Sequence, residues 1–205
     1  IINSLKRKEW ISFHSPSSFS LASSKLGWAI QNTVCLGLHH KPINSIRSQL
    51  APNTKFLLLL KNGSSVKKLA HFLSYEGFGK SELSVMESLG YKNEKIRKVK
   101  ADKLNFNDIK HPVCVGVYVK GQGDIITEST GKPDYFFNNN VPITKQPIRS
   151  ITIATLSPKP SEHLWDLGSG SGSISLEWML VNKNNKASAV EKEISRAKII
   201  KKTAN

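Results

Sequence analysis

The first part of the chain alternates short apolar runs with amphipathic stretches. Residues 56–60 form an unbroken run of Phe and Leu followed by Lys-Asn-Gly, which predicts a strand buried on both faces that ends in a turn. A helix should follow, with Ser64 or Ser65 as its N-cap and its end at Gly77. We expect four of its residues to face inward: Val66, Leu69, Ala70 and Leu73.

Three further elements are expected in this region. Pro16 introduces a helix within residues 15–28, and residues 83–86 and 113–119 are apolar enough to form strands. The helix has three apolar residues near helical spacing: Phe19, Ala22 and Leu26. The alternation of strands and helices predicts an α/β lobe in which some strands are parallel.

A second periodic region starts at Thr144. This residue is the expected N-cap of a helix that runs to Leu156 and is closed by Ser157-Pro158. The elements expected after it are a strand over 163–166, a Gly/Ser loop, a helix over 174–180, a strand over 187–191 and a helix from Glu193. This order is the opening of a Rossmann-like sheet.

A stretch rich in Gly, Asp, Asn and Pro separates the two regions. Such a composition is typical of a linker or of an arm that follows the protein surface. We therefore expect a first domain over residues 1–120, a linker or arm over 121–142, and a second domain over 143–205.

Charge adds little to this picture. The chain of 205 residues has 30 Lys and Arg against 15 Asp and Glu, a formal net charge of +15. This charge favours an anionic partner such as nucleic acid, acidic lipid or a small polycarboxylate. Because the basic residues are scattered, a lysine-rich solvated surface explains the charge equally well. Charge alone selects no partner.

Several classes of protein are excluded by what the sequence lacks. The longest apolar run, residues 56–60, is far shorter than the roughly 20 residues that span a membrane, and no secretory signal opens the chain. The two cysteines, Cys35 and Cys114, form no pair with metal spacing, so we expect neither a metal site nor a disulfide scaffold. These features predict a cytoplasmic protein that does not contact membranes.

The strongest chemical signal is an acid followed by a glycine loop, Asp166-Leu-Gly168-Ser-Gly170-Ser-Gly172. It follows an expected strand and opens an expected helix, where glycines let the backbone turn sharply and approach a ligand. A carboxylate at Asp166 would repel a pyrophosphate but attract a sulfonium-bearing aminoacyl group. Glu191 ends the next expected strand, where a carboxylate can accept both hydroxyls of a ribose.

Together, these acids and glycines form the S-adenosyl-L-methionine-binding pattern of class I methyltransferases. The alternative interpretation is a Gly/Ser turn beside a solvated Glu191. No catalytic acid or base is assigned, because a lone histidine is more often structural.

Two motifs flank this loop on its N-terminal side, Gly131-Lys-Pro-Asp-x-x-Phe137 and Ile143-Thr-Lys-x-x-x-Arg149, and Leu164–Trp178 contains it. This region resembles the C-15 methylating half of the decarboxylating precorrin methyltransferases of cobalamin biosynthesis. That family commonly carries a second acid after Pro-Asp, where this chain has Tyr135. The resemblance implies methylation of a precorrin at C-15 and removal of its C-12 acetate carboxylate.

Lys145 and Arg149 lie four residues apart, on one face of the expected helix. This placement suits contacts with substrate carboxylates. The alternative is that both are simply exposed helix cations.

The first region carries a resemblance of its own. Pro16–Trp28, Leu38-His39 and the segment 77–96 look like the C-5 methylating partner of the same family. That partner has the tetrapyrrole (class III) methyltransferase fold, which binds the same cofactor between two α/β lobes. The residues that this resemblance places near a second cofactor are Ser17, Ser18 and Ala22.

The two resemblances imply an α/β chain in which the C-terminal lobe of a tetrapyrrole (class III) methyltransferase is followed by the beginning of a Rossmann-like class I methyltransferase domain. The implied cofactor is S-adenosyl-L-methionine, and the implied partner is an anionic tetrapyrrole, a precorrin. We do not expect nucleic acid as a partner, and we expect the full-length protein to be a homo-oligomer. The implied class I cofactor residues are Asp166, Gly168, Gly170, Gly172 and Glu191.

Both halves depart from the family pattern at their outer ends. The first strand and glycine loop of the class III half have no counterpart, and the class I sheet stops after its second strand and helix. We therefore expect an internal piece of a longer protein. Two other functions stay open: a class I nucleic-acid methyltransferase that uses Asp166 and Glu191, and an inactive fragment that acts as a scaffold or interaction module.

Overall fold

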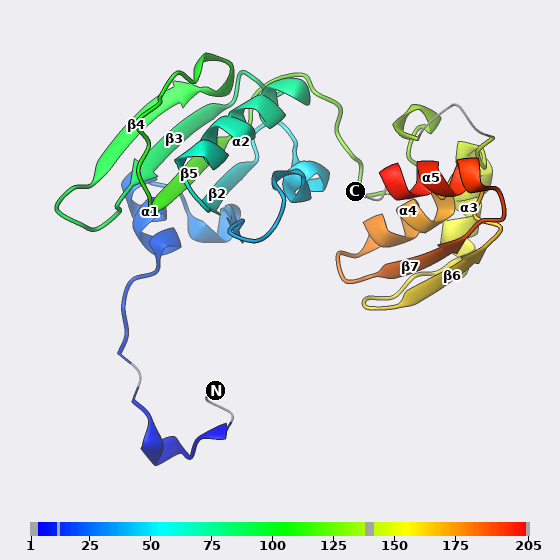
Figure 1. Cartoon of the computed structure of the whole chain (residues 1–205), viewed down its shortest axis with the longest axis horizontal. Helices are drawn as coiled ribbons and strands as arrows, with labels where there is room; N and C mark the ends of the chain where they lie inside the picture. The colour runs from blue at the N-terminus through cyan, green and yellow to red at the C-terminus, as the bar shows by residue number, and fades with distance from the viewer. Residues whose placement is uncertain (1–3, 12, 138–141, 204–205) are drawn as a thin grey trace. The chain divides into compact units, whose positions relative to one another are not determined.

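Two separate β-sheets divide the chain into two units (Figure 1). A computed structural model describes residues 4–11, 13–137 and 142–203. Unit 1 comprises Ile1–Ile125, and unit 2 comprises Ile126–Asn205. Within the described residues, no helix is long and apolar enough to span a bilayer.

Unit 1 contains a five-stranded mixed sheet with strand order β1-β2-β5-β3-β4. Strands β1 and β2 are parallel, whereas the other neighbours are antiparallel. The strand bounds are β1 (Val34–Gly37), β2 (Lys55–Leu60), β3 (Glu82–Glu87), β4 (Lys95–Lys100) and β5 (Val113–Tyr118). The sequence predicted β2, β3 and β5, which are confirmed, and missed the two edge strands β1 and β4.

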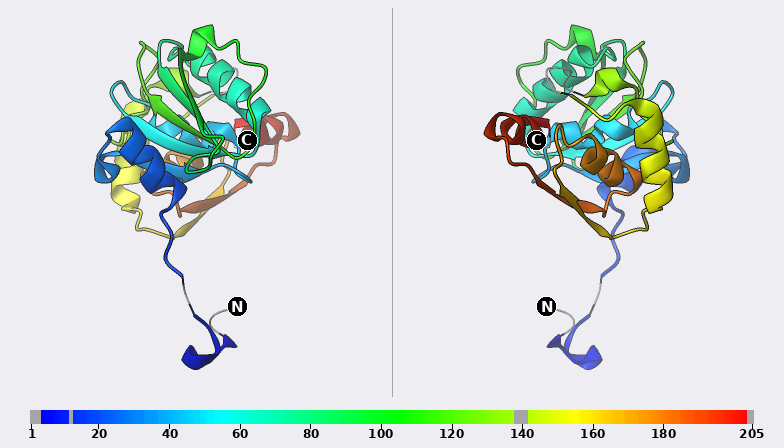
Figure 2. Two further views of the ribbon diagram at one scale, coloured as in Figure 1. Left: turned by 90° about the vertical axis from the view of Figure 1, so that its left-hand side faces the viewer. Right: turned by 90° about the vertical axis from the view of Figure 1, so that its right-hand side faces the viewer.

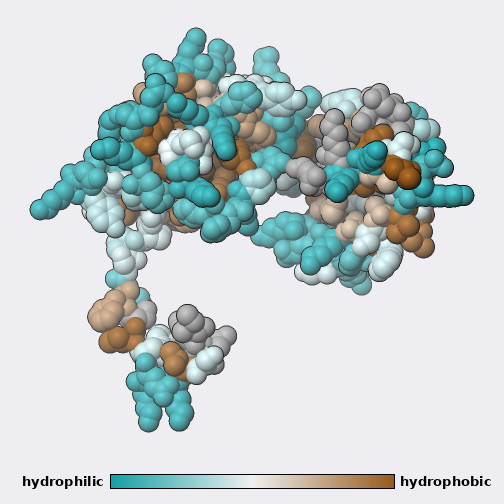
Figure 3. All heavy atoms as spheres, viewed as in Figure 1, coloured by the Kyte–Doolittle hydropathy of each residue, from teal (hydrophilic) through white to brown (hydrophobic). Residues whose placement is uncertain are grey.

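Alternate residues of this sheet supply two hydrophobic clusters on its opposite faces. Helix α2 (Gly63–Tyr75) packs on one face, and the shorter helix α1 (Ser18–Leu26) packs on the other (Figures 1 and 2). Short 3-10 segments connect the elements: η2 (Arg7–Glu9), η3 (Ile30–Asn32), η4 (Ile43–Gln49) and η5 (Ala101–Lys103). Hydrophilic residues cover most of the visible surface of unit 1 (Figure 3).

Helix α2 begins two or three residues earlier than the sequence indicated. Its N-cap is Asn62, whose side chain accepts a hydrogen bond from the Ser65 N–H at 3.1 Å. The expectation of Ser64 or Ser65 as N-cap is wrong, because the amide oxygen of Asn62 already takes that donor. The four expected inward residues are all buried, which confirms the predicted face.

Unit 2 contains a two-stranded parallel sheet and three helices in the predicted order. Their bounds are α3 (Gln146–Leu156), β6 (His163–Leu167), α4 (Ser173–Val181), β7 (Lys186–Val190) and α5 (Ile194–Thr203), and η6 (Asp134–Phe136) precedes them. The N-cap of α3 is Lys145 and not Thr144. The Thr144 carbonyl instead accepts a hydrogen bond from the Arg149 guanidinium.

The expected linker forms hydrogen bonds with unit 1 at its start and with α4 of unit 2 from its middle. The Gln122 N–H donates to the Gly77 carbonyl at 3.2 Å, and the Gly131 N–H donates to Glu177 at 2.7 Å. The stretch from Asn138 to Val141 lies outside the described residues. The domain boundaries near residues 120 and 142 stay a prediction.

A buried ion pair joins α3 to α4. The Arg149 Nε lies 2.6 Å from Glu177 Oε1, and both side chains are fully enclosed. The guanidinium also donates to the carbonyls of Thr144 and Lys132 and to Asp134 Oδ1 at 3.1 Å. Its carbon lies 4.2 Å from the centre of the Phe137 ring. Glu177 belongs to α4, whereas the other partners lie between Lys132 and Thr144. The ion pair therefore fixes the segment before α3 onto the two helices.

Glu177 completes the ion pair with backbone partners. The N–H groups of Gly131 and Lys132 donate to its two carboxylate oxygens at 2.7 and 2.8 Å. Lys132 is buried beside them and donates its ammonium to the Ser129 carbonyl at 2.6 Å. Burial lowers the pKa of Lys132, and the neighbouring Arg149 lowers it further, while Glu177 opposes the shift.

We predict that Glu177→Gln destabilises unit 2 by about 3–5 kcal/mol, because it leaves the Arg149 guanidinium without its fully buried counter-ion and only the half-exposed Asp134 beside it. Hydrogen exchange of peptides from unit 2, measured against urea, reports this loss separately from unit 1. Glu193→Gln removes the same charge from an exposed position and should change little. Equal protection in the two variants would contradict a structural role for the ion pair.

The reactivity of the buried Cys114 thiol provides a test of how unit 1 is packed. Its thiol faces α1 within the cluster of Leu57 and Met86, and burial raises its pKa to about 12. Because the thiolate is the reactive form, we predict that iodoacetamide at about pH 8 leaves Cys114 unmodified until urea unfolds unit 1. Mass spectrometry of the digested protein measures this, and rapid labelling in the folded protein would contradict the packing.

Candidate functional site

The predicted glycine loop connects β6 to α4. Gly168, Gly170 and Gly172 all adopt the left-handed backbone region, with φ of 79°, 56° and 75°, which side chains other than glycine rarely accept. A Cβ on Gly168 or Gly170 would meet nothing within 4 Å, whereas one on Gly172 would lie 3.2 Å from Ile200. The first two glycines therefore border open space, and the third packs against α5.

The end of β7 holds this loop in place. The N–H groups of Gly168 and Ser169 both donate to the Val190 carbonyl, at 2.9 and 3.1 Å. Gly172 closes the turn by donating to the Ser169 carbonyl at 2.8 Å. The loop therefore lies at the carboxyl ends of both parallel strands, where α/β proteins place ligands.

Glu191 follows β7 and reaches back to the loop. Its Oε2 accepts a hydrogen bond from the Gly170 N–H at 2.7 Å, and its Oε1 accepts one from the Glu193 N–H at 3.0 Å. Hydrogen bonds from Glu193 and then Gly170 lower the pKa of Glu191. The structure thus brings this acid to the glycine loop as an ionised, half-buried carboxylate.

Asp166 lies near the end of β6, and its carboxylate is held from α4. The hydroxyl of Ser175, in the first turn of α4, donates to Asp166 Oδ2 at 2.7 Å. Sequence reasoning missed Ser175. Its position three residues after Gly172 was the available signal, because a first-turn hydroxyl can reach back to the preceding strand end. Ser175 is 4% exposed, so its contact is shielded from water.

A cavity of about 280 Å³ adjoins the loop between α4, β7 and α5. Gly172 and Glu191 border it at the loop, and its walls include Leu176, Met179 and Ile200. The candidate site therefore combines carboxylates, left-handed glycines and an apolar recess.

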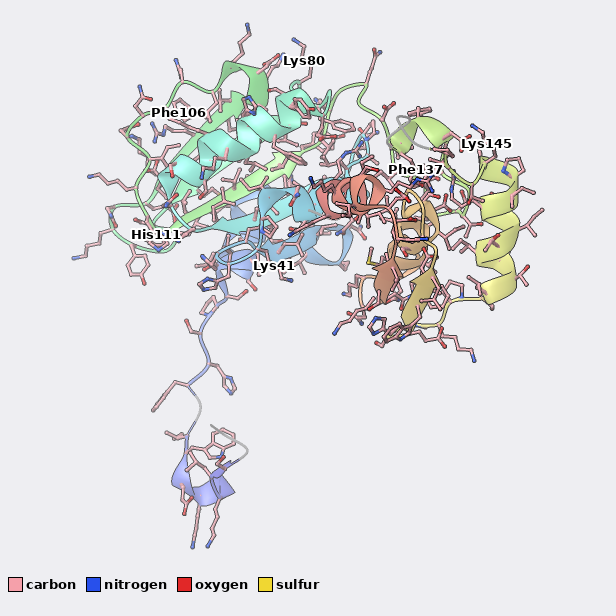
Figure 4. The ribbon with its side chains drawn as sticks, turned by 45° about the vertical axis from the view of Figure 1, so that its right-hand side comes forward. Lys41, Lys80, Phe106, His111, Phe137 and Lys145 are labelled. Atoms are coloured by element: carbon pink, nitrogen blue, oxygen red, sulfur yellow. The ribbon has the colours of Figure 1, made fainter. Side chains whose placement is uncertain are left out.

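The two expected substrate-binding cations have different surroundings. Lys145 is exposed at the start of α3, and its ammonium lies 3.8 Å from Asp134 (Figure 4). Arg149 is completely enclosed by protein partners. The expectation that Lys145 and Arg149 share an exposed helix face is therefore wrong for Arg149. This side chain points into unit 2 and has no exposed atom for a substrate carboxylate.

The residues expected to contact a second cofactor lie on α1 in unit 1. Ser17 is the N-cap and accepts a hydrogen bond from the Ser20 N–H at 3.1 Å, and Ser18 is exposed beside it. The Ala22 side chain is fully buried against the sheet. It offers no surface to a ligand, which corrects that part of the expectation, whereas the roles of Ser17 and Ser18 stay predictions.

The chain is similar to several known proteins. A family described as a precorrin methyltransferase domain matches residues 135–205. The chain is 37% identical over 192 residues to the precorrin-6Y C(5,15)-methyltransferase [decarboxylating] of Sinorhizobium sp., covering 92% of this chain and 46% of the relative. It is 30% identical over 175 residues to the enzyme of that name from Mycobacterium tuberculosis, covering 79% of this chain and 40% of the relative.

Among solved structures, the C-terminal domain of precorrin-6Y C5,15-methyltransferase from Rhodobacter capsulatus is 39% identical. It aligns with a TM-score of 0.36 and covers 38% of this chain and 41% of that chain. The chain spans about half the length of the curated relatives it matches. The resemblance identified from the sequence is confirmed: the chain is a relative of the decarboxylating precorrin-6Y C(5,15)-methyltransferases.

Proposed function

We propose that the chain is part of an S-adenosyl-L-methionine-dependent enzyme that methylates a precorrin at C-5 and C-15 and removes the C-12 acetate carboxylate. In this proposal, unit 1 is a lobe of the C-5 methylating, tetrapyrrole (class III) half. Unit 2 is the beginning of the class I half that acts at C-15. The relatives support the reaction, and the site in unit 2 supports the cofactor.

One contact carries the cofactor assignment: the Gly170 N–H donates to Glu191 Oε2 at 2.7 Å. It places an ionised acid beside a loop whose first two glycines border open space, because a Cβ on Gly168 or Gly170 would touch nothing. These features fit a nucleoside whose ribose hydroxyls need a carboxylate acceptor. The residues proposed to hold the cofactor are Asp166, Gly168, Gly170, Gly172 and Glu191.

S-adenosyl-L-methionine would supply the electrophilic methyl group, and the protein would position it. The Glu191 carboxylate has acceptor capacity left after its two backbone hydrogen bonds, since an ionised carboxylate has about four lone-pair sites. Asp166, oriented by Ser175, can accept from an ammonium group. The recess beside Gly172 has a largely apolar lining and would help to position a bound cofactor, which methyl transfer requires.

The charge of the chain agrees with a polycarboxylate substrate. The formal net charge of +15 attracts anions and speeds their association. Lys145 is exposed and is the proposed substrate contact on unit 2, whereas Arg149 has the structural role described above.

We predict that Glu191→Ala weakens S-adenosyl-L-methionine binding by about 1.5–3 kcal/mol, because a charge-assisted ribose contact is lost. Isothermal titration calorimetry on the 205-residue chain measures the change. Glu193→Ala is the matched control: it removes the same charge two residues away and keeps the backbone N–H that Glu191 uses.

If the two variants bind the cofactor equally well, Glu191 is not the ribose acceptor. Absence of cofactor binding by the unsubstituted chain would overturn the assignment of unit 2.

Ser175→Ala should weaken cofactor binding about 3- to 10-fold, because a net hydrogen bond to Asp166 of about 1 kcal/mol is lost. Ser173→Ala, in the same turn of α4, is the control, and Ser175→Thr should restore the affinity by returning the hydroxyl. Thermal unfolding of each variant shows whether the fold is kept. Failure of the threonine to restore binding would indicate a packing role for Ser175 instead.

A further inference from the structure

The α1 face of the sheet in unit 1 is covered along only part of its length. Helix α1 packs over Leu57, Met86 and Cys114 and ends at Leu26. A cavity of about 530 Å³ remains beside it, over the ends of β2, β3, β4 and β5. The residues that define this cavity, which we call the β4 groove, are Trp28, Lys55, Ser84, Lys98, Lys100 and Tyr118.

The backbone of β5 explains how Trp28 comes to flank the groove. Gly116 lies in the middle of that strand, where a Cβ would stand 2.5 Å from Leu26 Cδ1 and 3.4 Å from the Trp28 ring. The missing side chain lets both residues lie close against the sheet. Trp28 therefore forms an apolar wall beside the groove instead of filling it.

Three lysines supply positive charge to the groove. Lys98 and Lys100 are two residues apart on β4 and pair with Ser84 and Glu82 of β3, so both face the α1 side. The Lys55 ammonium lies 5.5 Å from the centre of the Trp28 ring and 6.0 Å from that of Tyr118. Across the part of the chain that the structure describes, none of the three lysines forms an ion pair.

The acid at the edge of the groove does not cancel this charge. Glu82 lines the groove, but its carboxylate accepts from the Lys120 ammonium at 2.6 Å. Lys120, which does not line the groove, thereby neutralises the charge of Glu82. The net charge on the groove is therefore positive, and it belongs to lysines with free ammonium donors.

Ser84 marks the floor of the groove. Its side chain is only 7% exposed, and among the residues with described positions its hydroxyl has no hydrogen-bond partner. The hydroxyl is not among the fully buried polar atoms that lack a partner, so it is open to the groove. It therefore places a hydrogen-bond donor at the base of the cationic groove, within reach of a polar ligand group.

We infer that the β4 groove binds the carboxylate side chains of a flat, polyanionic ligand. Lys98 and Lys100 are about 7 Å apart along the strand, so each can meet its own carboxylate. Ser84 donates a hydrogen bond from the floor, and Trp28 and Tyr118 offer ring faces to a conjugated system. The positive charge disfavours S-adenosyl-L-methionine, which itself carries a sulfonium and an ammonium group.

The choice of ligand rests on the proposed function, in which the substrate is an anionic tetrapyrrole. The groove adds a location for its acidic arms on unit 1, whereas the glycine loop belongs to unit 2. No residue of the groove belongs to the proposed cofactor set.

Uroporphyrin I, a planar tetrapyrrole whose side chains are all carboxylic acids, is a suitable probe. Its binding to the full 205-residue chain can be followed by its absorbance and by quenching of tryptophan fluorescence. We expect Lys98→Gln and Lys100→Gln each to weaken binding about 2- to 5-fold, and the double variant roughly tenfold, as for partly exposed charge pairs. Ser84→Ala should weaken binding without lowering the melting temperature, because no protein partner is lost.

Lys68→Gln is the matched control, since Lys68 is exposed on α2, which covers the opposite face of the sheet. It should leave the affinity unchanged, and the fully esterified porphyrin should not bind. Equal weakening by Lys68→Gln, or unchanged affinity in both the double variant and Ser84→Ala, would overturn the inference.

Cofactor binding measured in the same samples separates this inference from the proposed function. Porphyrin binding that depends on Lys98 and Lys100, in a chain that does not bind S-adenosyl-L-methionine, would support the groove and count against the proposed function. If the chain binds S-adenosyl-L-methionine but its porphyrin affinity does not depend on Lys98 or Lys100, the result would support the proposed function and count against the β4 groove.

Discussion

The fully enclosed ion pair between Arg149 and Glu177 determines how unit 2 is assembled. A guanidinium without water needs protein partners for its N–H groups, and leaving a buried charge unpaired is very costly. Arg149 finds these partners in Glu177 on α4, in Asp134, and in the carbonyls of Lys132 and Thr144. Because they come from several segments, burial of one side chain aligns the region before α3 with both helices, and α4 in turn carries the glycine loop at its start.

Unit 1 depends on a different constraint, the alternation of side chains along its strands. On β2 and β5, successive residues enter different hydrophobic clusters, so both faces of these central strands require cover. The 13-residue α2 covers one face, whereas the nine-residue α1 is too short to cover the other. The uncovered part lies toward the edge strand β4, whose lysines face the same side. The β4 groove is therefore a consequence of helix length combined with strand register.

Elements with strong periodicity were predicted well from the sequence, and those defined by tertiary partners were not. The apolar run of β2 and the inward face of α2 followed from pattern alone. Strand β4 was missed because an edge strand needs few apolar residues, so its Lys-Ile-Arg-Lys-Val-Lys sequence looked only like a basic cluster. The glycine loop could be located from the sequence because strand, loop and helix are local. The burial of Arg149 depends on Glu177, 28 residues away, and no local pattern contains that information.

Three carboxylates in unit 2 show why residue type alone did not separate structure from ligand binding. Glu177 accepts hydrogen bonds from two backbone N–H groups and from Arg149, and it is fully buried. Glu191 accepts from two backbone groups and Asp166 from the hydroxyl of Ser175, and both are half-buried. An ionised carboxylate has about four acceptor sites, so Glu191 and Asp166 combine access to solvent with unused capacity. Glu177 has no exposed surface through which a ligand could reach it. The remaining acceptor capacity and its accessibility therefore select Asp166 and Glu191 as the acids available to a ligand.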